Sequence, residues 1–91
     1  MHTLIESELY SHQAAQLGDI ERIDDALTGV TWAISIMPEE FPPLRGLGQL
    51  RVAKSERLRK RTGFVQLRVW FAIRDAHHVE LLGVDYAQVL S

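Results

Sequence analysis

The spacing of the apolar residues changes in the middle of this chain, and that change constrains the fold most. Before Pro38 they recur at steps of three and four, as on one face of a helix. After Pro43 they alternate with polar residues, as on one face of a strand. A proline-rich connector, residues 37–46, separates the two parts. The 91 residues therefore predict a single α+β domain over residues 1–91, with helices first and strands after them.

Two helices are expected in the first part. A capping box at Thr3–Glu6 predicts a helix over residues 4–17, and a short initial strand is an open alternative. Asp19 can cap a second helix over residues 20–37, which Pro38 would end. The apolar residues that share one face of this second helix are Ile20, Ile23, Leu27, Val30, Ile34 and Met37.

Three strands are expected in the second part, at residues 49–54, 65–74 and 79–84. The middle one is the clearest, because five apolar side chains alternate with five on the other face. The predicted core face holds Val65, Leu67, Val69, Phe71 and Ile73, and the other holds Gln66, Arg68, Trp70, Ala72 and Arg74. The helical hairpin would pack on one face of a three- to four-stranded antiparallel sheet and leave the other face open.

The predicted strand at residues 49–54 is less regular. Leu50 and Val52 are predicted to point into the core, and Arg51 and Ala53 to point to the open face. A basic loop over residues 55–63 would follow this strand, and residues 75–78 would form the next turn.

The charge of the chain is divided between the same two parts. Up to Pro43 there is one basic residue against eight acidic ones, and from Leu44 onward there are nine against four. The net charge of −2 therefore conceals a basic half that suits phosphate or an acidic partner. Mutual neutralisation of the two halves within one domain is the alternative interpretation.

Most of these cations fall on or beside the predicted open face. Arg51 and Arg68 would project from it, with Trp70 two residues along the same strand as Arg68. The basic loop adds Arg57, Arg59, Lys60 and Arg61. Cations beside an aromatic ring suit a single-stranded nucleic acid, since phosphates need charge and bases need a flat surface. A solvated basic loop beside a packed tryptophan is the alternative.

Other familiar sites are not predicted. The chain has no cysteine, and its four histidines show no ligand spacing with carboxylates, so we expect neither a metal nor another cofactor. The longest uncharged run, residues 26–38, is too short for a membrane span of roughly 20 residues. Without a recognisable signal peptide, a cytoplasmic protein is expected.

Four segments carry a resemblance to a known family: residues 38–44 (PEEFPPL), 50–54 (LRVAK), 67–73 (LRVWFAI) and 79–84 (VELLGV). With the elements around them they resemble the RelE/ParE superfamily of toxins from type II toxin–antitoxin systems, over about residues 18–84. The resemblance implies a helical hairpin packed on an antiparallel sheet. RelE-type toxins cleave mRNA on the ribosome, ParE-type toxins poison DNA gyrase, and both are neutralised by an antitoxin.

The resemblance also implies a catalytic set of four residues. Arg68 resembles the strand arginine that RelE-type nucleases place on the scissile phosphate, and Arg51 and Lys54 resemble the cationic pair of the preceding strand. Tyr86 resembles the tyrosine near the last strand, but the basic residue expected there is not kept, and Asp85 precedes Tyr86. Alternation would also place Arg51 and Lys54 on opposite sides unless a bulge intervenes.

The resemblance therefore predicts a ribosome-dependent mRNA endonuclease that works without metal. In that mechanism a ribose 2′-hydroxyl attacks the adjacent phosphate, Lys54 or Tyr86 assists proton transfer, and Arg51 and Arg68 stabilise the developing charge. The alternative is a non-enzymatic inhibitor or binding module of the same fold, acting on gyrase or binding only an antitoxin.

The second helix predicts a protein interface as well. Gly29, Trp32 and Ile36 fall on the side opposite to its core-facing residues. The first helix would cover part of this surface. We expect the rest, around Trp32 and Ile36, to be available to a partner and to form a homodimer when no antitoxin is bound.

Overall fold

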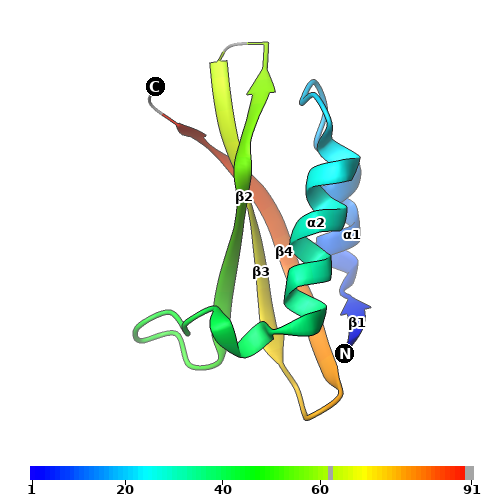
Figure 1. Cartoon of the computed structure of the whole chain (residues 1–91), viewed down its shortest axis with the longest axis vertical. Coiled ribbons are helices and arrows are strands. Elements are labelled where there is room, and N and C mark those ends of the chain that lie inside the picture. The colour runs from blue at the N-terminus through cyan, green and yellow to red at the C-terminus, as the bar shows by residue number, and fades with distance from the viewer. Residues whose placement is uncertain (62, 90–91) are drawn as a thin grey trace.

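The computed structural model describes residues 1–61 and 63–89, and residues 62, 90 and 91 lie outside this description. Two α-helices, one short 3-10 helix and four strands make up an α+β domain (Figure 1). In chain order they are β1 (Thr3–Glu6), α1 (Glu8–Ala15), α2 (Ile23–Ile36), η1 (Pro38–Glu40), β2 (Leu50–Lys60), β3 (Gly63–Ile73) and β4 (His78–Val89). Among the described residues, no helix is long and apolar enough to cross a membrane.

The strands form one mixed sheet in the order β1-β4-β3-β2. The three long strands pair antiparallel as a meander, whereas β1 pairs parallel with β4. The prediction of an antiparallel sheet is therefore wrong for β1. Its direction follows from the connection, because the chain leaves β1 through both helices before it enters the meander.

The first predicted helix is confirmed, but it spans Glu8–Ala15 rather than residues 4–17, and the alternative of a short initial strand is confirmed for Thr3–Glu6. The helix begins only at Glu8, because Ser7 caps it by accepting a hydrogen bond of 3.1 Å from the Tyr10 amide. The Ser7 amide in turn donates to the Leu81 carbonyl at 3.0 Å, which continues the pairing of β1 with β4. The Thr3–Glu6 segment gains more from these sheet hydrogen bonds than from a helical turn.

The second helix is confirmed, but it begins at Ile23 rather than at residue 20. The preceding residues pair with the edge of β2 instead: Ile20 forms a bridge with Lys60, and the Glu21 amide donates to the Arg59 carbonyl at 2.9 Å. Asp19 therefore does not cap the helix. The N-cap position of α2 is occupied by Arg22, whose side chain makes no capping hydrogen bond.

Most of residues 55–63, predicted as a loop, belong instead to β2 and the start of β3. A bulge between Lys54 and Arg57 shifts the register with β3. Ser55 lies in this bulge, buried, and its hydroxyl accepts a hydrogen bond of 2.9 Å from the Leu67 amide. A buried hydroxyl thus replaces one of the ladder partners that the bulge removes, which allows a single long strand.

The predicted faces of residues 50–53 are inverted. Ala53 lies opposite Val69 and is buried in the core, and Arg51 lies opposite Phe71 on the same side of the sheet. Leu50 and Val52 face the other way. The reason is that α2 packs over β2, where the core position is filled by a small side chain.

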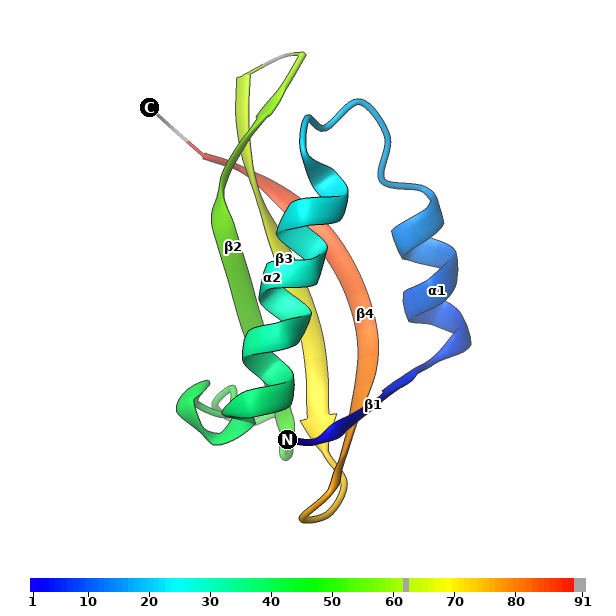
Figure 2. The ribbon, with the colours of Figure 1, turned by 45° about the vertical axis from the view of Figure 1, so that its right-hand side comes forward.

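The core lies between the sheet and the helices. In Figure 2, α2 lies over β2 and β3, while α1 lies along β4. The predicted core face of β3 is confirmed, since Val65, Leu67, Val69 and Phe71 are all buried. The Gln13 side chain of α1 closes the edge of β4 by accepting a hydrogen bond of 2.9 Å from the Val84 amide.

Candidate nucleic-acid interface

The sheet face that points away from α2 carries a row of cations beside two aromatic rings. Residues directly opposite each other in antiparallel strands share a face, so the register assigns each side chain to one side of the sheet. We call this set the cationic strip, and it comprises Lys54, Arg57 and Arg59 of β2 and Phe64, Arg68 and Trp70 of β3. Lys54 lies opposite Arg68, and Arg59 lies opposite Phe64.

Each aromatic ring of the strip has an arginine above it. The guanidinium carbon of Arg68 lies 5.5 Å from the centre of the Trp70 ring, and that of Arg59 lies 5.9 Å from the centre of the Phe64 ring. Phe64 is 39% exposed and Trp70 is half-buried. Each pair therefore offers a phosphate-binding charge next to a surface on which a base can stack.

Phe64 is the member of the strip that the sequence did not predict. The alternation of β3 gives the signal, because extending it one residue back from Val65 places Phe64 on the open face.

A glycine shapes the surroundings of Trp70. Gly83 lies opposite Trp70 in β4, and a Cβ atom there would lie 2.8 Å from the Gln13 Oε1 atom and 3.8 Å from Trp70 Cδ1. The absent side chain lets the Gln13 amide and the indole ring approach the backbone of β4. Trp70 is thus held at the edge of a small hollow that Leu9 and Leu82 also line.

Arg68 forms a bidentate ion pair on this face. Its Nε and Nη2 atoms donate to the two carboxylate oxygens of Asp85 at 2.8 and 2.7 Å, a bidentate pair. The hydrogen bond with Asp85 raises the pKa of the Arg68 guanidinium above its ordinary value. Asp85 therefore occupies the donors of Arg68 that a phosphate would use.

The sheet separates the four predicted catalytic residues. Lys54 and Arg68 lie on the open face, whereas Arg51 and Tyr86 lie opposite Phe71 and Leu67 on the helix face.

Arg51 donates through Nη1 to the Phe41 carbonyl, and its buried Nε has no hydrogen-bond partner among the described residues. Tyr86 lies beneath the Lys60 ammonium, whose nitrogen is 4.9 Å from the ring centre. Neither side chain reaches the space above Arg68.

The other predicted binding residues divide in the same way. Arg57 lies on the open face opposite Gln66, Lys60 faces the helix side, and Arg61 lies in the turn after β2.

The surface predicted to bind a partner is open in the single chain. Trp32 is 57% exposed and Ile36 is 39% exposed on α2.

Metal binding has no support in the described part of the chain, where no three His, Asp or Glu side chains lie close enough to hold an ion. Comparisons with protein-family models, curated proteins and solved structures gave no match to this chain.

Proposed function

We propose that this chain binds single-stranded RNA along the cationic strip and inhibits translation as a non-enzymatic, RelE/ParE-type toxin. The strip carries the proposal, because four cations and two exposed or half-exposed aromatic rings share the sheet face that points away from α2. Phosphates of a single strand pair with the cations while its bases stack on Phe64 and Trp70. A duplex offers no such unstacked bases.

RNA cleavage, which the resemblance also implies, is less favoured than binding alone. An in-line attack needs the acid, the base and the charge-stabilising groups around one phosphate. Here Lys54 and Arg68 lie on one side of the sheet and Arg51 and Tyr86 on the other. This separation favours a binding module over a ribosome-dependent mRNA endonuclease.

The biological setting comes from the resemblance alone. As a member of a toxin–antitoxin pair, the chain would be held inactive by a cognate antitoxin, and its target would be mRNA on the ribosome. The alternative target, DNA gyrase, lacks a specific observation in its favour. The stacked arginine–aromatic pairs favour RNA.

Fluorescence anisotropy with a labelled RNA of about twelve nucleotides tests the binding. The wild-type chain should bind the single strand more tightly than a duplex of the same length. Arg68→Ala and Trp70→Ala should each weaken binding, the latter by about 1–3 kcal/mol. Arg74→Ala and Trp32→Ala are matched controls outside the strip, and they should bind like wild type.

Mapping of mRNA 5′ ends on ribosomes separates the two modes of inhibition. Our proposal expects inhibited growth and translation on induced expression without new mRNA ends. New ends that disappear in Lys54→Ala would instead support the endonuclease. Equal binding of single strand and duplex, unaffected by Trp70→Ala, would contradict the proposal.

A further inference from the structure

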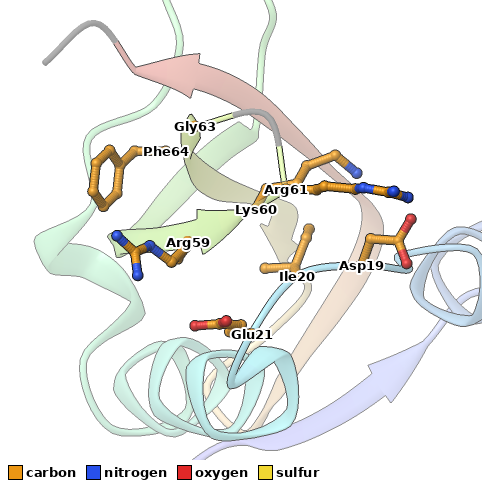
Figure 3. A pocket seen from close by; sticks show the side chains of 8 residues that line it. All are labelled: Asp19, Ile20, Glu21, Arg59, Lys60, Arg61, Gly63 and Phe64. Atoms are coloured by element: carbon orange, nitrogen blue, oxygen red, sulfur yellow. The ribbon is translucent and has the colours of Figure 1, made fainter.

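A second hollow lies at the tip of the β2–β3 hairpin, on the edge of the sheet. It has a volume of about 720 Å³, within the range of small-molecule sites. Figure 3 shows the eight side chains and backbone positions around it: Asp19, Ile20, Glu21, Arg59, Lys60, Arg61, Gly63 and Phe64. We call it the hairpin hollow. It combines cations, carboxylates and an aromatic ring.

The acidic rim of the hairpin hollow is fixed by the backbone. The Ile20 bridge to Lys60 and the Glu21 hydrogen bond to Arg59 attach this loop to β2. Asp19 and Arg22, on either side, adopt positive φ angles of 59° and 61°, which non-glycine residues rarely do. The surroundings therefore hold the backbone that carries Asp19 and Glu21 in place at a cost in backbone strain.

The charged groups of the hollow do not neutralise one another directly. Among the described residues, none of its three cations or two carboxylates takes part in a salt bridge. In Figure 3, Glu21, Arg59 and Phe64 lie on one side of Ile20, and Asp19, Lys60 and Arg61 lie on the other. The hollow thus offers two different ends to a ligand.

A simple anion would satisfy only the cations and would be repelled by the two carboxylates. A nucleotide fits both ends, since it joins an anionic phosphate to a flat base that carries donors and acceptors. Guanine fits best, because its O6 and N7 atoms accept from an arginine while its N1 and N2 groups donate to a carboxylate. Arg59 and Glu21 are such a pair, and Phe64 supplies a ring for stacking.

We propose that the hairpin hollow binds a guanine nucleotide, with the base at Phe64, Arg59 and Glu21 and the phosphate at Arg61. The site extends the proposed RNA binding, because Arg59 and Phe64 also end the cationic strip. It accepts either a free nucleotide or one guanosine of a bound strand.

Isothermal titration of the full chain with guanosine 5′-monophosphate, uridine 5′-monophosphate and inorganic phosphate tests the inference. The guanine nucleotide should bind roughly fivefold or more tightly than either of the others. Phe64→Ala should weaken both nucleotides, by roughly fivefold or more, and leave phosphate unchanged. Glu21→Gln should bring the two nucleotides to about equal affinity, because it removes the acceptor that selects guanine.

Arg74→Ala is the matched control, since Arg74 is an exposed arginine outside both the cationic strip and the hairpin hollow. It should leave the binding of the guanine nucleotide unchanged. Guanosine monophosphate that binds no better than inorganic phosphate, or a guanine preference that survives Glu21→Gln, would overturn the inference.

A uridine oligomer separates this inference from the proposed function. If the oligomer binds in an Arg68-dependent manner while guanosine monophosphate does not bind, the inference fails and the RNA-binding function stands. If guanosine monophosphate binds and the uridine oligomer does not, the RNA-binding function fails and the nucleotide site stands. An oligomer with one terminal guanosine should gain affinity that Glu21→Gln removes, which would assign the hollow to a strand end as well as to the free nucleotide.

Discussion

Replacing Asp85 with asparagine should increase the affinity for RNA. In the unbound chain the Asp85 carboxylate holds Arg68 through two hydrogen bonds of 2.8 and 2.7 Å. A phosphate that approaches Arg68 must displace this carboxylate and then remain close to its charge. An asparagine at this position would keep the shape of the side chain but remove both the competition and the repulsion.

The size of the effect follows from the exposure of the pair. Two like charges about 4 Å apart repel by about 1 kcal/mol in a water-like medium and by about 4 kcal/mol at an effective dielectric constant of 20. The side chains of Arg68 and Asp85 are 35% and 45% exposed, so solvent and salt place the repulsion near the lower value. A gain of about 1 kcal/mol corresponds to roughly fivefold tighter binding. The lost ion pair should cost about 1 kcal/mol of unfolding free energy or less.

Anisotropy titrations with the single-stranded RNA at low and physiological salt measure the gain, and urea unfolding measures the cost. Glu80→Gln is the matched control, because Glu80 also pairs with an arginine, Arg74, on the same face of β4. It lies five residues from Asp85, roughly 15 Å along the strand. If Asp85→Asn binds RNA no more tightly than Glu80→Gln, Arg68 does not contact phosphate.

Three further predictions concern stability and assembly. Phe71→Ala should lower the free energy of unfolding, measured in urea, by about 3–5 kcal/mol, because Phe71 is fully buried and packs edge-on against Phe41 with the ring centres 5.7 Å apart. An unchanged unfolding midpoint would refute the assigned strand faces. Burial raises the pKa of Tyr10, so its contribution to stability is present below pH about 10 and is lost as the pH rises through the folded-state pKa. Tyr10→Phe should therefore flatten the alkaline decline in melting temperature, and an identical decline would contradict this. Sedimentation at micromolar concentration should show a dimer that Trp32→Glu dissociates, whereas a wild-type monomer would exclude the dimer.

The alternation of β3 could be read from the sequence because every second side chain is buried by the same layer of helices. The sequence could not show which side chains of β2 point into the core. The parity of β2 depends on which of two adjacent residues fits beneath α2, and the small Ala53 is buried there while the larger Val52 faces the other way. The extension of β2 through Glu56 depends on a bulge. There the Ser55 hydroxyl accepts a hydrogen bond from the Leu67 amide, 12 residues away.

The same limits apply to the candidate site. Arg68 and Trp70 could be placed on the open face from the strand pattern alone. The ion pair of Arg68 with Asp85 joins two strands through their register, which no local pattern contains. The hairpin hollow joins the Asp19–Glu21 loop to the tip of the hairpin through tertiary contacts and positive φ angles, so the sequence offered no signal for it.

The salt dependence of RNA binding tests the central claim most directly. A single strand that contacts four cations of the strip, Lys54, Arg57, Arg59 and Arg68, should bind with a slope of log K against log salt of about −3. Removing one of them in Arg57→Ala should reduce the slope by about 0.7 in magnitude, whereas Arg45→Ala, outside the strip, should leave it unchanged. A slope near zero, or one that Arg57→Ala and Arg45→Ala change equally, would contradict RNA binding on this face.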